Sequence, residues 1–217
     1  MALVRQRFSI SSAAPCLWRA ARCFFGGKDI TRLSEYKRAD QIGRVFQDPK
    51  KGTCDELTIL ENMALADNKH KAYGLSRGVN KRRTDYYRTL LETCGMGLED
   101  RLNVKAGTLS GGQRQALALI LANMTDIELL ILDEHTAALD PKSSETVMRI
   151  TDKLVKEKQV TSLMVTHNLR FALEYGSRLV MMHEGRCVLD VRGEEKQKLE
   201  IDALLKVFNE ISVECGN

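Results

Sequence analysis

Residues 109–115 read Leu-Ser-Gly-Gly-Gln-Arg-Gln, and the Ala- and Leu-rich run after them predicts a helix over about Gln113 to Met124. Ser110 suits the N-cap of that helix, because its hydroxyl can accept a hydrogen bond from an otherwise unpaired amide. Gly111 and Gly112 would let backbone N–H groups approach an anion without an obstructing Cβ, at the positive end of a helix dipole. The pattern therefore favours a phosphate-facing turn, with an ordinary glycine turn before a core helix as the alternative.

The segment 127–134 reads Ile-Glu-Leu-Leu-Ile-Leu-Asp-Glu, which is an apolar run that ends in two acids. This composition predicts a buried parallel strand whose carboxylates lie at its carboxyl end, the edge where open α/β sheets bind ligands. Asp133 suits a Mg²⁺ ligand that acts through water, since Mg²⁺ keeps much of its hydration shell. For such a pair of acids taken alone, a core strand ending in solvated acids is the alternative.

Two polar positions follow this strand along the chain. Residues 138–141, Ala-Leu-Asp-Pro, suit a turn and predict a helix that starts at about Lys142 to Thr146. Residues 160–166, Val-Thr-Ser-Leu-Met-Val-Thr, predict another strand, and His167 follows it. A lone histidine after a strand is usually structural or exposed, but its place after the acidic strand and a helix favours a functional role.

A strand is also predicted upstream of the glycine-containing motif. Residues 42–49 read Ile-Gly-Arg-Val-Phe-Gln-Asp-Pro, in which Val45 and Phe46 suit the end of a strand and Pro49 stops it. Gln47 places a neutral amide just beyond this strand end. The chain thus carries polar residues after three predicted strands, besides the glycine-containing motif.

In order and spacing, these segments resemble the ATP-binding domain of ATP-binding-cassette (ABC) transporters, over about residues 26 to 208. The resemblance implies an α/β fold, a P-loop NTPase-like parallel sheet of the ABC ATPase type with a helical subdomain over about residues 50–108. It implies ATP and Mg²⁺ as cofactors, and in this family each ATP lies between two subunits. The partial ABC ATPase domain is expected to span residues 26–210, with 211–217 as a tail.

The resemblance also implies a role for each polar residue of these segments. The signature and the D-loop are implied to contact ATP or to communicate across the dimer interface, through Ser110, Gly111, Gly112, Gln113 and Asp140. Catalytic roles at the attacking water are implied for Glu134 in the Walker B motif, His167 in the H-loop and Gln47 in the Q-loop. Asp133 and Gln47 are implied to hold Mg²⁺.

Two segments narrow the resemblance to a transport role. Residues 133–141 carry His135 where proline is common, and residues 181–186 read Met-Met-His-Glu-Gly-Arg. They resemble the ATP-binding subunits of a bacterial importer group linked with tryptophan/tyrosine-type or uncharacterised substrates. The implied partners are a second ABC ATPase subunit and separate transmembrane permease subunits, at the cytoplasmic face of the cell membrane. A non-transport ABC ATPase is one alternative, and an inactive fragment or regulatory partner that completes another subunit's ATP site is a second.

The sequence contains no phosphate-binding P-loop of the form G-x-x-x-x-G-K-[ST]. The only Gly-Lys pair, Gly27-Lys28, is followed by Asp29, and Arg22 stands where the first glycine belongs. Residues 1–25 contain four arginines and no acid, which fits an organellar targeting peptide, whereas Ser and Pro interrupt the apolar run that a secretory signal needs. A foreign or frame-shifted leader is the favoured interpretation of this segment. The chain alone is therefore expected not to hydrolyse ATP, and loss of the P-loop strand and helix is expected to expose apolar surface.

Composition places the chain among globular domains. Of its 217 residues, 43% are hydrophobic and 29% are charged, which is typical of a soluble domain with one sizeable core. No stretch approaches the ~18 apolar residues of a membrane span, so a membrane role requires a separate partner. The net charge of +4 does not indicate nucleic acid as a partner, and the six cysteines lack metal-ligand spacing and predict reduced thiols.

Secondary structure is also predicted outside the motifs. Helices are expected over Leu57 to Ala66, Thr84 to Gly95 and Glu194 to Phe208, and a hairpin is expected from Arg178–His183 and Arg186–Val191. A basic stretch lies around the first two helices, and it fits either a solvated face or a surface near the permease or anionic lipid headgroups. Its members are Lys69, Lys71, Arg77, Lys81, Arg82, Arg83 and Arg88.

Overall fold

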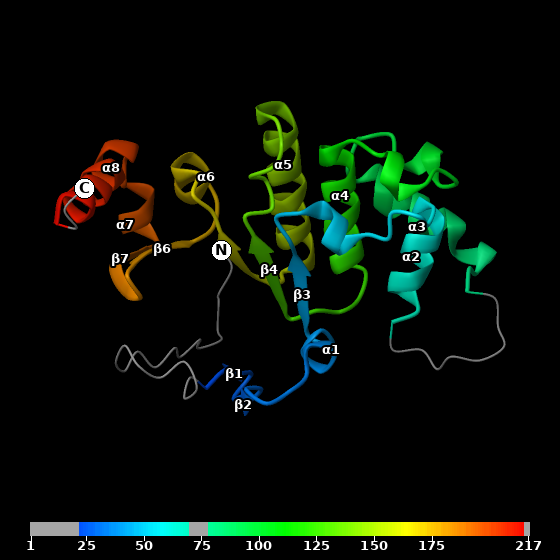
Figure 1. Cartoon of the computed structure of the whole chain (residues 1–217), viewed down its shortest axis with the longest axis horizontal. Helices are drawn as coiled ribbons and strands as arrows, with labels where there is room; N and C mark the ends of the chain where they lie inside the picture. Colours follow the sequence, from blue (N-terminus) through cyan, green and yellow to red (C-terminus); the bar gives the residue numbers. More distant parts are fainter. Residues whose placement is uncertain (1–21, 70–77, 215–217) are drawn as a thin grey trace. The chain divides into compact units, whose positions relative to one another are not determined.

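The computed structural model describes residues 22–69 and 78–214, and the chain divides into two units (Figure 1). Of the described residues, the first unit ends at Val165 and the second begins at Thr166. Most of the predicted leader, residues 1–21, lies outside the described residues, as do Lys71 and Arg77 of the basic stretch.

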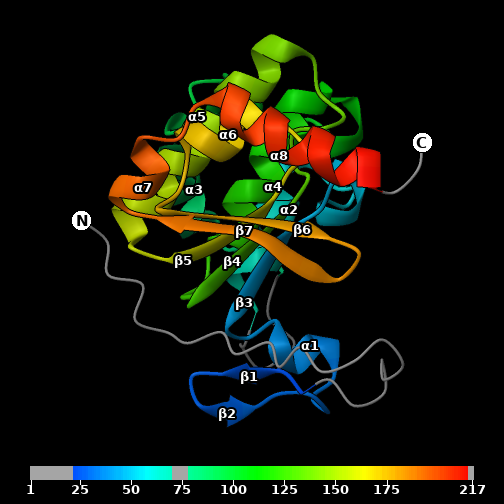
Figure 2. The ribbon, with the colours of Figure 1, turned by 90° about the vertical axis from the view of Figure 1, so that its left-hand side faces the viewer.

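The first unit is built on a sheet of three parallel strands in the order β3-β4-β5. These strands are β3 (Ile42–Val45), β4 (Leu129–Asp133) and β5 (Thr161–Val165), so all three strands expected from the sequence are confirmed with small shifts of their ends. Figure 2 shows the strands side by side, with α2 and α4 to one side of them. Parallel strands bring their carboxyl ends to the same edge, where the predicted polar residues lie.

The two faces of this sheet differ in burial. Alternating side chains put Val45, Leu130 and Leu132 on the face that joins the main core. On the opposite face, Leu163 and Val165 of β5 are each 49% exposed. The two faces therefore differ, with the main core on one and exposed apolar side chains of β5 on the other.

Four helices of the first unit surround the buried face. They are α2 (Ile59–Asp67), α3 (Thr84–Glu92), α4 (Gly111–Ala122) and α5 (Pro141–Lys158), and they confirm the helices expected in these places. In Figure 1, α4 lies between α5 and the pair formed by α2 and α3, and it contacts all three. Thr58 starts α2 with a capping box, in which its side chain and that of Glu61 bond each other's backbone amides.

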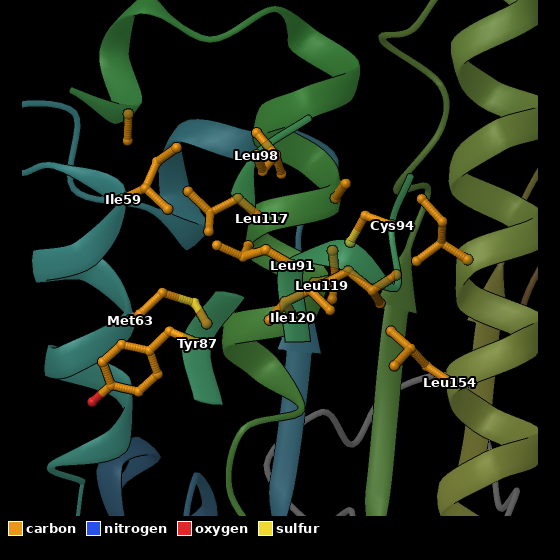
Figure 3. Close-up of a cluster of buried hydrophobic side chains, with 14 of the residues drawn as sticks. Ile59, Met63, Tyr87, Leu91, Cys94, Leu98, Leu117, Leu119, Ile120 and Leu154 are labelled. Carbon is orange, nitrogen blue, oxygen red and sulfur yellow. The ribbon is translucent and has the colours of Figure 1, made fainter. Parts of the chain in front are cut away.

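The core between these helices is made of large, fully buried side chains (Figure 3). Its labelled members include Ile59, Met63, Tyr87, Leu91, Leu98, Leu117, Leu119 and Ile120. Full burial of one such side chain stabilises the fold by roughly 1.5–3 kcal/mol. Cys94 belongs to the same cluster, and burial raises the pKa of its thiol to about 11.

Short elements precede the sheet. A hairpin of β1 (Phe24–Phe25) and β2 (Lys28–Asp29) leads to α1 (Glu35–Arg38). Phe25 and Ile30 are buried against Leu129, on the face of the sheet opposite the helices. Short 3₁₀ turns join the other elements, at Pro49–Gly52, Lys81–Arg83, Glu99–Arg101 and Ala106–Thr108.

The second unit contains α6 (Leu169–Glu174), β6 (Arg178–His183) and β7 (Arg186–Arg192). The two strands pair antiparallel, so the predicted hairpin is confirmed. Its turn residues Glu184 and Gly185 have φ values of 45° and 75°, as a two-residue turn with left-handed central residues requires.

The prediction of one closing helix from Glu194 to Phe208 is wrong. The chain forms two helices instead, α7 (Glu194–Gln197) and α8 (Ile201–Glu214). Lys196 of α7 is 5% exposed, although lysine is usually a surface residue.

Three backbone carbonyls surround the Lys196 ammonium. Its Nζ donates to the carbonyl oxygens of Leu173, Tyr175 and Gly176 at 2.6, 2.8 and 3.0 Å. Burial lowers the pKa of this lysine, while the three acceptors satisfy all of its N–H groups. Lys196 therefore ties α7 to the end of α6.

None of the helices in the described residues is both long and apolar enough for a membrane span.

Candidate functional site

The amino terminus of α4 is the best-defined part of the predicted site. Ser110 is the N-cap, its Oγ accepts the Gln113 N–H at 3.3 Å, and the Gln113 Oε1 accepts the Ser110 N–H at 3.3 Å. This reciprocal pair leaves the amides of Gly111 and Gly112 without a protein acceptor in the described part of the chain. The predicted N-cap is confirmed, and at this positive helix end Gly111 is exposed whereas Gly112 is buried.

Arg114 fixes the loop that leads into α4. Its side chain is only 8% exposed and pairs with Asp55 at 3.2 Å. The guanidinium also donates to the carbonyl oxygens of Ala106 and Gly107, at 3.2 and 2.6 Å. A buried arginine with so many acceptors holds the segment before the signature in one geometry.

The turn at residues 138–141 starts α5 as predicted. Asp140 is the N-cap, and its carboxylate accepts the Ser143 N–H at 3.0 Å. Hydrogen bonds with Ser143 lower the pKa of Asp140 from its ordinary value, so the cap stays ionised. Asp140 is exposed, which leaves it accessible at the surface of the first unit.

Asp133 ends β4 and forms an ion pair with Arg44 of β3, with 2.7 Å between Nη2 and Oδ2. The guanidinium also lies 4.6 Å from the centroid of the Phe46 ring. Sequence reasoning missed Arg44, although strand alternation could have revealed it. Arg44 pairs in register with Ile131, so it and Asp133 project from the same face.

Glu134 has a φ of 44°, a left-handed conformation that costs a non-glycine residue roughly 1–2 kcal/mol. Two backbone bonds hold it there. Its N–H donates to the Val165 carbonyl at 3.0 Å, and its own carbonyl accepts the Ala137 N–H at 2.9 Å. Strain of this kind gathers at functional sites, and here it belongs to the predicted catalytic carboxylate.

His135 was noted in the sequence only as a departure from proline, and the structure gives it a partner. It is 2% exposed, and its Nε2 lies 3.2 Å from the Oγ1 of Thr151 on α5. Burial lowers the pKa of His135 to about 4, so the ring is neutral near pH 7. It fixes the backbone just after Glu134 onto α5.

The remaining predicted catalytic residues are not brought together in the same way. Gln47 is exposed just beyond β3, on the sheet edge that also carries Asp133. His167 is exposed too, and it belongs to the second unit. Its role remains a prediction.

The Gly-Lys pair does not form a phosphate-binding loop. Gly26 and Gly27, with φ values of 55° and 78°, make the tight turn between β1 and β2, and Lys28 lies in β2. The Asp29 carboxylate accepts the Thr31 N–H at 2.9 Å. A P-loop needs a long helix after the lysine, and no such helix follows here.

The donor set at the strand edge fits Mg²⁺ in part. No group of three His, Cys, Asp or Glu side chains that could hold a metal lies within residues 22–69 and 78–214. Mg²⁺ commonly takes only one or two protein oxygens and completes its shell with phosphates and water, so the role of Asp133 and Gln47 as its ligands stays a prediction. In this structure the guanidinium of Arg44 forms an ion pair with the Asp133 carboxylate, the group that Mg²⁺ would use.

The basic stretch is partly neutralised within the first unit. Arg83 donates to Asp67 at 2.8 Å and lies 4.3 Å from the centroid of the Tyr86 ring. Arg88 pairs with Asp85 at 3.7 Å. Lys81 and Arg82 are exposed. This pairing favours a solvated face over a strongly basic docking surface.

Known proteins match this chain in sequence. The sequence profile of the ABC transporter family matches residues 18–137. A tyrosine transport ATP-binding protein of Clostridioides difficile (strain R20291) is 49% identical over 179 residues, 82% of this chain and 71% of that relative. A phosphonates import ATP-binding protein of Rhodopseudomonas palustris (strain HaA2) is 30% identical over 188 residues, 85% of this chain and 65% of that relative. The chain thus spans about two thirds of the length of these relatives.

Solved structures match its fold. An ATP-binding cassette of an ABC transporter in an ADP conformation has a TM-score of 0.68 at 25% identity, and the match covers 92% of this chain and 78% of that one. A dimeric cassette bound to ADP and phosphate has a TM-score of 0.66 at 26% identity, covering 80% of this chain and 74% of that one. The fold and the sequence therefore agree that the chain belongs to the ABC transporter family and has the ATP-binding-domain fold of that family.

Proposed function

We propose that this chain is an ATP-binding subunit of an ABC importer that contributes its signature, residues 110–113, to ATP held by a second subunit. The observation that carries the proposal is a contrast within one chain. The signature is formed and capped by Ser110, while the Gly27-Lys28 pair lies in a hairpin turn. A chain of this kind can donate to a phosphate without holding one by itself.

The chemistry follows from the first turn of α4. ATP supplies the phosphoryl group whose transfer to water releases energy for transport. The amides of Gly111 and Gly112 and the hydroxyl of Ser110 face that phosphate in the paired state, and the helix dipole favours its negative charge. Gln113 keeps Ser110 in its capping geometry. These donors are preorganised, so they need no rearrangement when charge develops on the phosphate.

The strand edge would provide the remaining groups once a phosphate loop is supplied beside it. Asp133 and Gln47 would hold Mg²⁺. Glu134 would orient or deprotonate the attacking water, and His167 would contact the water and the phosphate. Asp140 would face the second subunit across the dimer interface.

The relatives support the transport role and the partners. One carries the name of a tyrosine transport protein and another that of a phosphonates import protein, so a small solute is the cargo class, with an amino acid of the tyrosine type as the first choice. A second ATPase subunit and a separate membrane permease are the proposed partners, and the importer's ATPase subunits lie at the cytoplasmic face of the membrane. In this proposal residues 26–210 form the ABC domain, and its helical part, about residues 50–108, meets the permease.

The test uses the C. difficile relative as the second subunit, with its own signature serine replaced by arginine so that its homodimers are inactive. Adding the present chain is expected to restore ATP hydrolysis, measured as phosphate release. Ser110→Arg in this chain should reduce the restored rate by about 100-fold, the scale seen when one preorganised donor is removed. Ser34→Arg is the matched control, because Ser34 also precedes a helix and is exposed but makes no side-chain cap bond. Mixed dimers that form but hydrolyse no ATP would overturn the proposal.

A further inference from the structure

Helix α4, which carries the signature, packs closely against α5 at Gly112. Gly112 is buried, and a Cβ built on it would lie 2.9 Å from both the Cβ and the Oγ of Ser143. A Cβ on Gly111 would lie 3.3 Å from the Cδ2 of Leu139. Since real Cβ atoms do not approach other atoms within 3.0 Å, the glycine is required by a neighbour in the same chain as well as by any phosphate.

The surface that meets Gly112 is itself held firmly. The Ser143 N–H donates to the Asp140 carboxylate at 3.0 Å. The neighbouring Ser144 Oγ donates to the Thr136 carbonyl at 3.1 Å and lies 3.4 Å from the Leu139 carbonyl. These hydrogen bonds fix the first turn of α5 to the turn before it, so they hold the backbone of Ser143 in place.

The same turn leads back to the strained glutamate. The Ala137 N–H donates to the Glu134 carbonyl at 2.9 Å, and the Leu139 N–H donates to the Thr136 carbonyl at 3.2 Å. A short run of backbone bonds thus joins Glu134, at this chain's own strand edge, to the contact between Ser143 and Gly112. A displacement at one end has few ways to relax before it reaches the other.

We propose that Ser143 is a positioning residue, which sets the place of the signature amides through its contact with Gly112 and couples them to the turn that carries Glu134 and Asp140. In a dimer, this contact would link the chain's own strand edge with the ATP site that its signature completes in the partner. The effect on ATP rests on the function proposed above, whereas the positioning contact itself does not.

The test adds a Cβ at residue 112 and then removes the Ser143 atoms that this Cβ would contact. Gly112→Ala should shift the amide resonances of Gly111 and Gln113 and also those of Leu139 and Asp140 in ¹H–¹⁵N spectra of the full chain. Ser143→Gly in the same chain removes both the Cβ and the Oγ and should return these resonances toward their original positions. Ser143→Ala is the matched control, because its Cβ keeps the 2.9 Å conflict and should give no rescue.

The mixed-dimer assay gives the functional readout. Gly112→Ala should lower the restored ATPase rate at least tenfold, with recovery in the pair with Ser143→Gly and none in the pair with Ser143→Ala. Equal rescue by both, or shifts confined to α4, would overturn the proposal. If Gly112→Ala does not fold, Ser143→Gly alone decides: faster hydrogen exchange at the Gly112 amide supports the contact, and unchanged exchange contradicts it. Spectral rescue in a chain that never supports ATP hydrolysis would refute the proposed function and leave the contact standing.

Discussion

The amino-terminal end of α4 and the carboxyl edge of the sheet are built in opposite ways. At α4, Ser110 and Gln113 cap each other and Arg114 is buried with several acceptors. At the sheet edge, the side chain of Asp133 is 39% exposed and that of its ion-pair partner Arg44 is 46% exposed. The polar side chains of the first region are held by partners within the chain, whereas those of the second region are exposed to solvent.

The difference teaches which half of an ATP site this chain can supply alone. In the proposed function, the groups that would reach a neighbour's phosphate lie at the start of α4, whose apolar side chains pack into the main core. The groups that would act on the chain's own phosphate lack a phosphate-binding loop in the sequence and border exposed apolar residues of β5. The first half should therefore tolerate isolation, and the second should not.

The largest expected effect is the absence of ATP hydrolysis by the purified chain. Without a phosphate cradle, the strand edge cannot fix ATP near Glu134, so phosphate release should equal the protein-free background. Steady phosphate release that Glu134→Gln abolishes would contradict this expectation and would erase the contrast between the two regions.

Arg114→Met tests the first region. It removes a buried charge partner of Asp55 and the guanidinium donors to the carbonyls of Ala106 and Gly107, so the free energy of unfolding should fall by about 3 kcal/mol. Urea denaturation followed by circular dichroism measures the change. Arg149→Met, at an exposed position of α5, is the control and should change stability by less than about 0.5 kcal/mol. Similar losses in both variants would mean that Arg114 has no special role.

His135 makes the fold depend on pH. Its folded-state pKa is about 4, whereas an unfolded histidine titrates near ~6.5. Between these two pKa values the unfolded chain binds a proton at His135 that the folded chain does not bind. The free energy of unfolding therefore falls as the pH drops from ~6.5 toward 4, by an amount on the order of 3 kcal/mol.

Urea titrations across this pH range measure that dependence. His135→Gln should flatten the loss between pH 6.5 and 4, while His167→Gln, at an exposed position, should leave it in place. An unchanged slope in His135→Gln would show that the buried ring is not its source, and that the segment after Glu134 is looser than the structure indicates.

The smallest effect is expected at the sheet edge. Arg44→Gln removes an ion pair whose two side chains are 46% and 39% exposed, so unfolding free energy should change by less than about 1 kcal/mol. The same urea experiment measures it, with Asp133→Asn as the reciprocal variant. A loss as large as that of Arg114→Met would show that the edge is as firmly built as the signature.

Much of the fold was predictable, because the strands and helices carry strong local signals. The apolar run before Asp133 and the β-branched run before His167 gave the right strands, and Ser110 was correctly assigned as an N-cap. These features depend on residues close together in the chain, which periodicity and capping rules detect.

The features that were missed depend on contacts between distant segments. The ion pair of Arg44 with Asp133 joins two strands, and the hydrogen bond of His135 with Thr151 joins a loop to a helix. The buried Lys196 of α7 donates to carbonyls at the end of α6. A continuous amphipathic pattern over residues 194–208 gave no local sign of that contact.

The three carbonyls around Lys196 also have a consequence for chemical footprinting. An amine reacts with acylating reagents only as a free base with an accessible lone pair, and all three N–H groups of this ammonium are engaged in the folded chain. Exposed lysines such as Lys156 and Lys198 will be labelled while Lys196 is spared. The acylation state of one lysine, read by mass spectrometry, thus reports whether the last third of the chain is folded inside a crude extract, where no purified sample or bound nucleotide is needed.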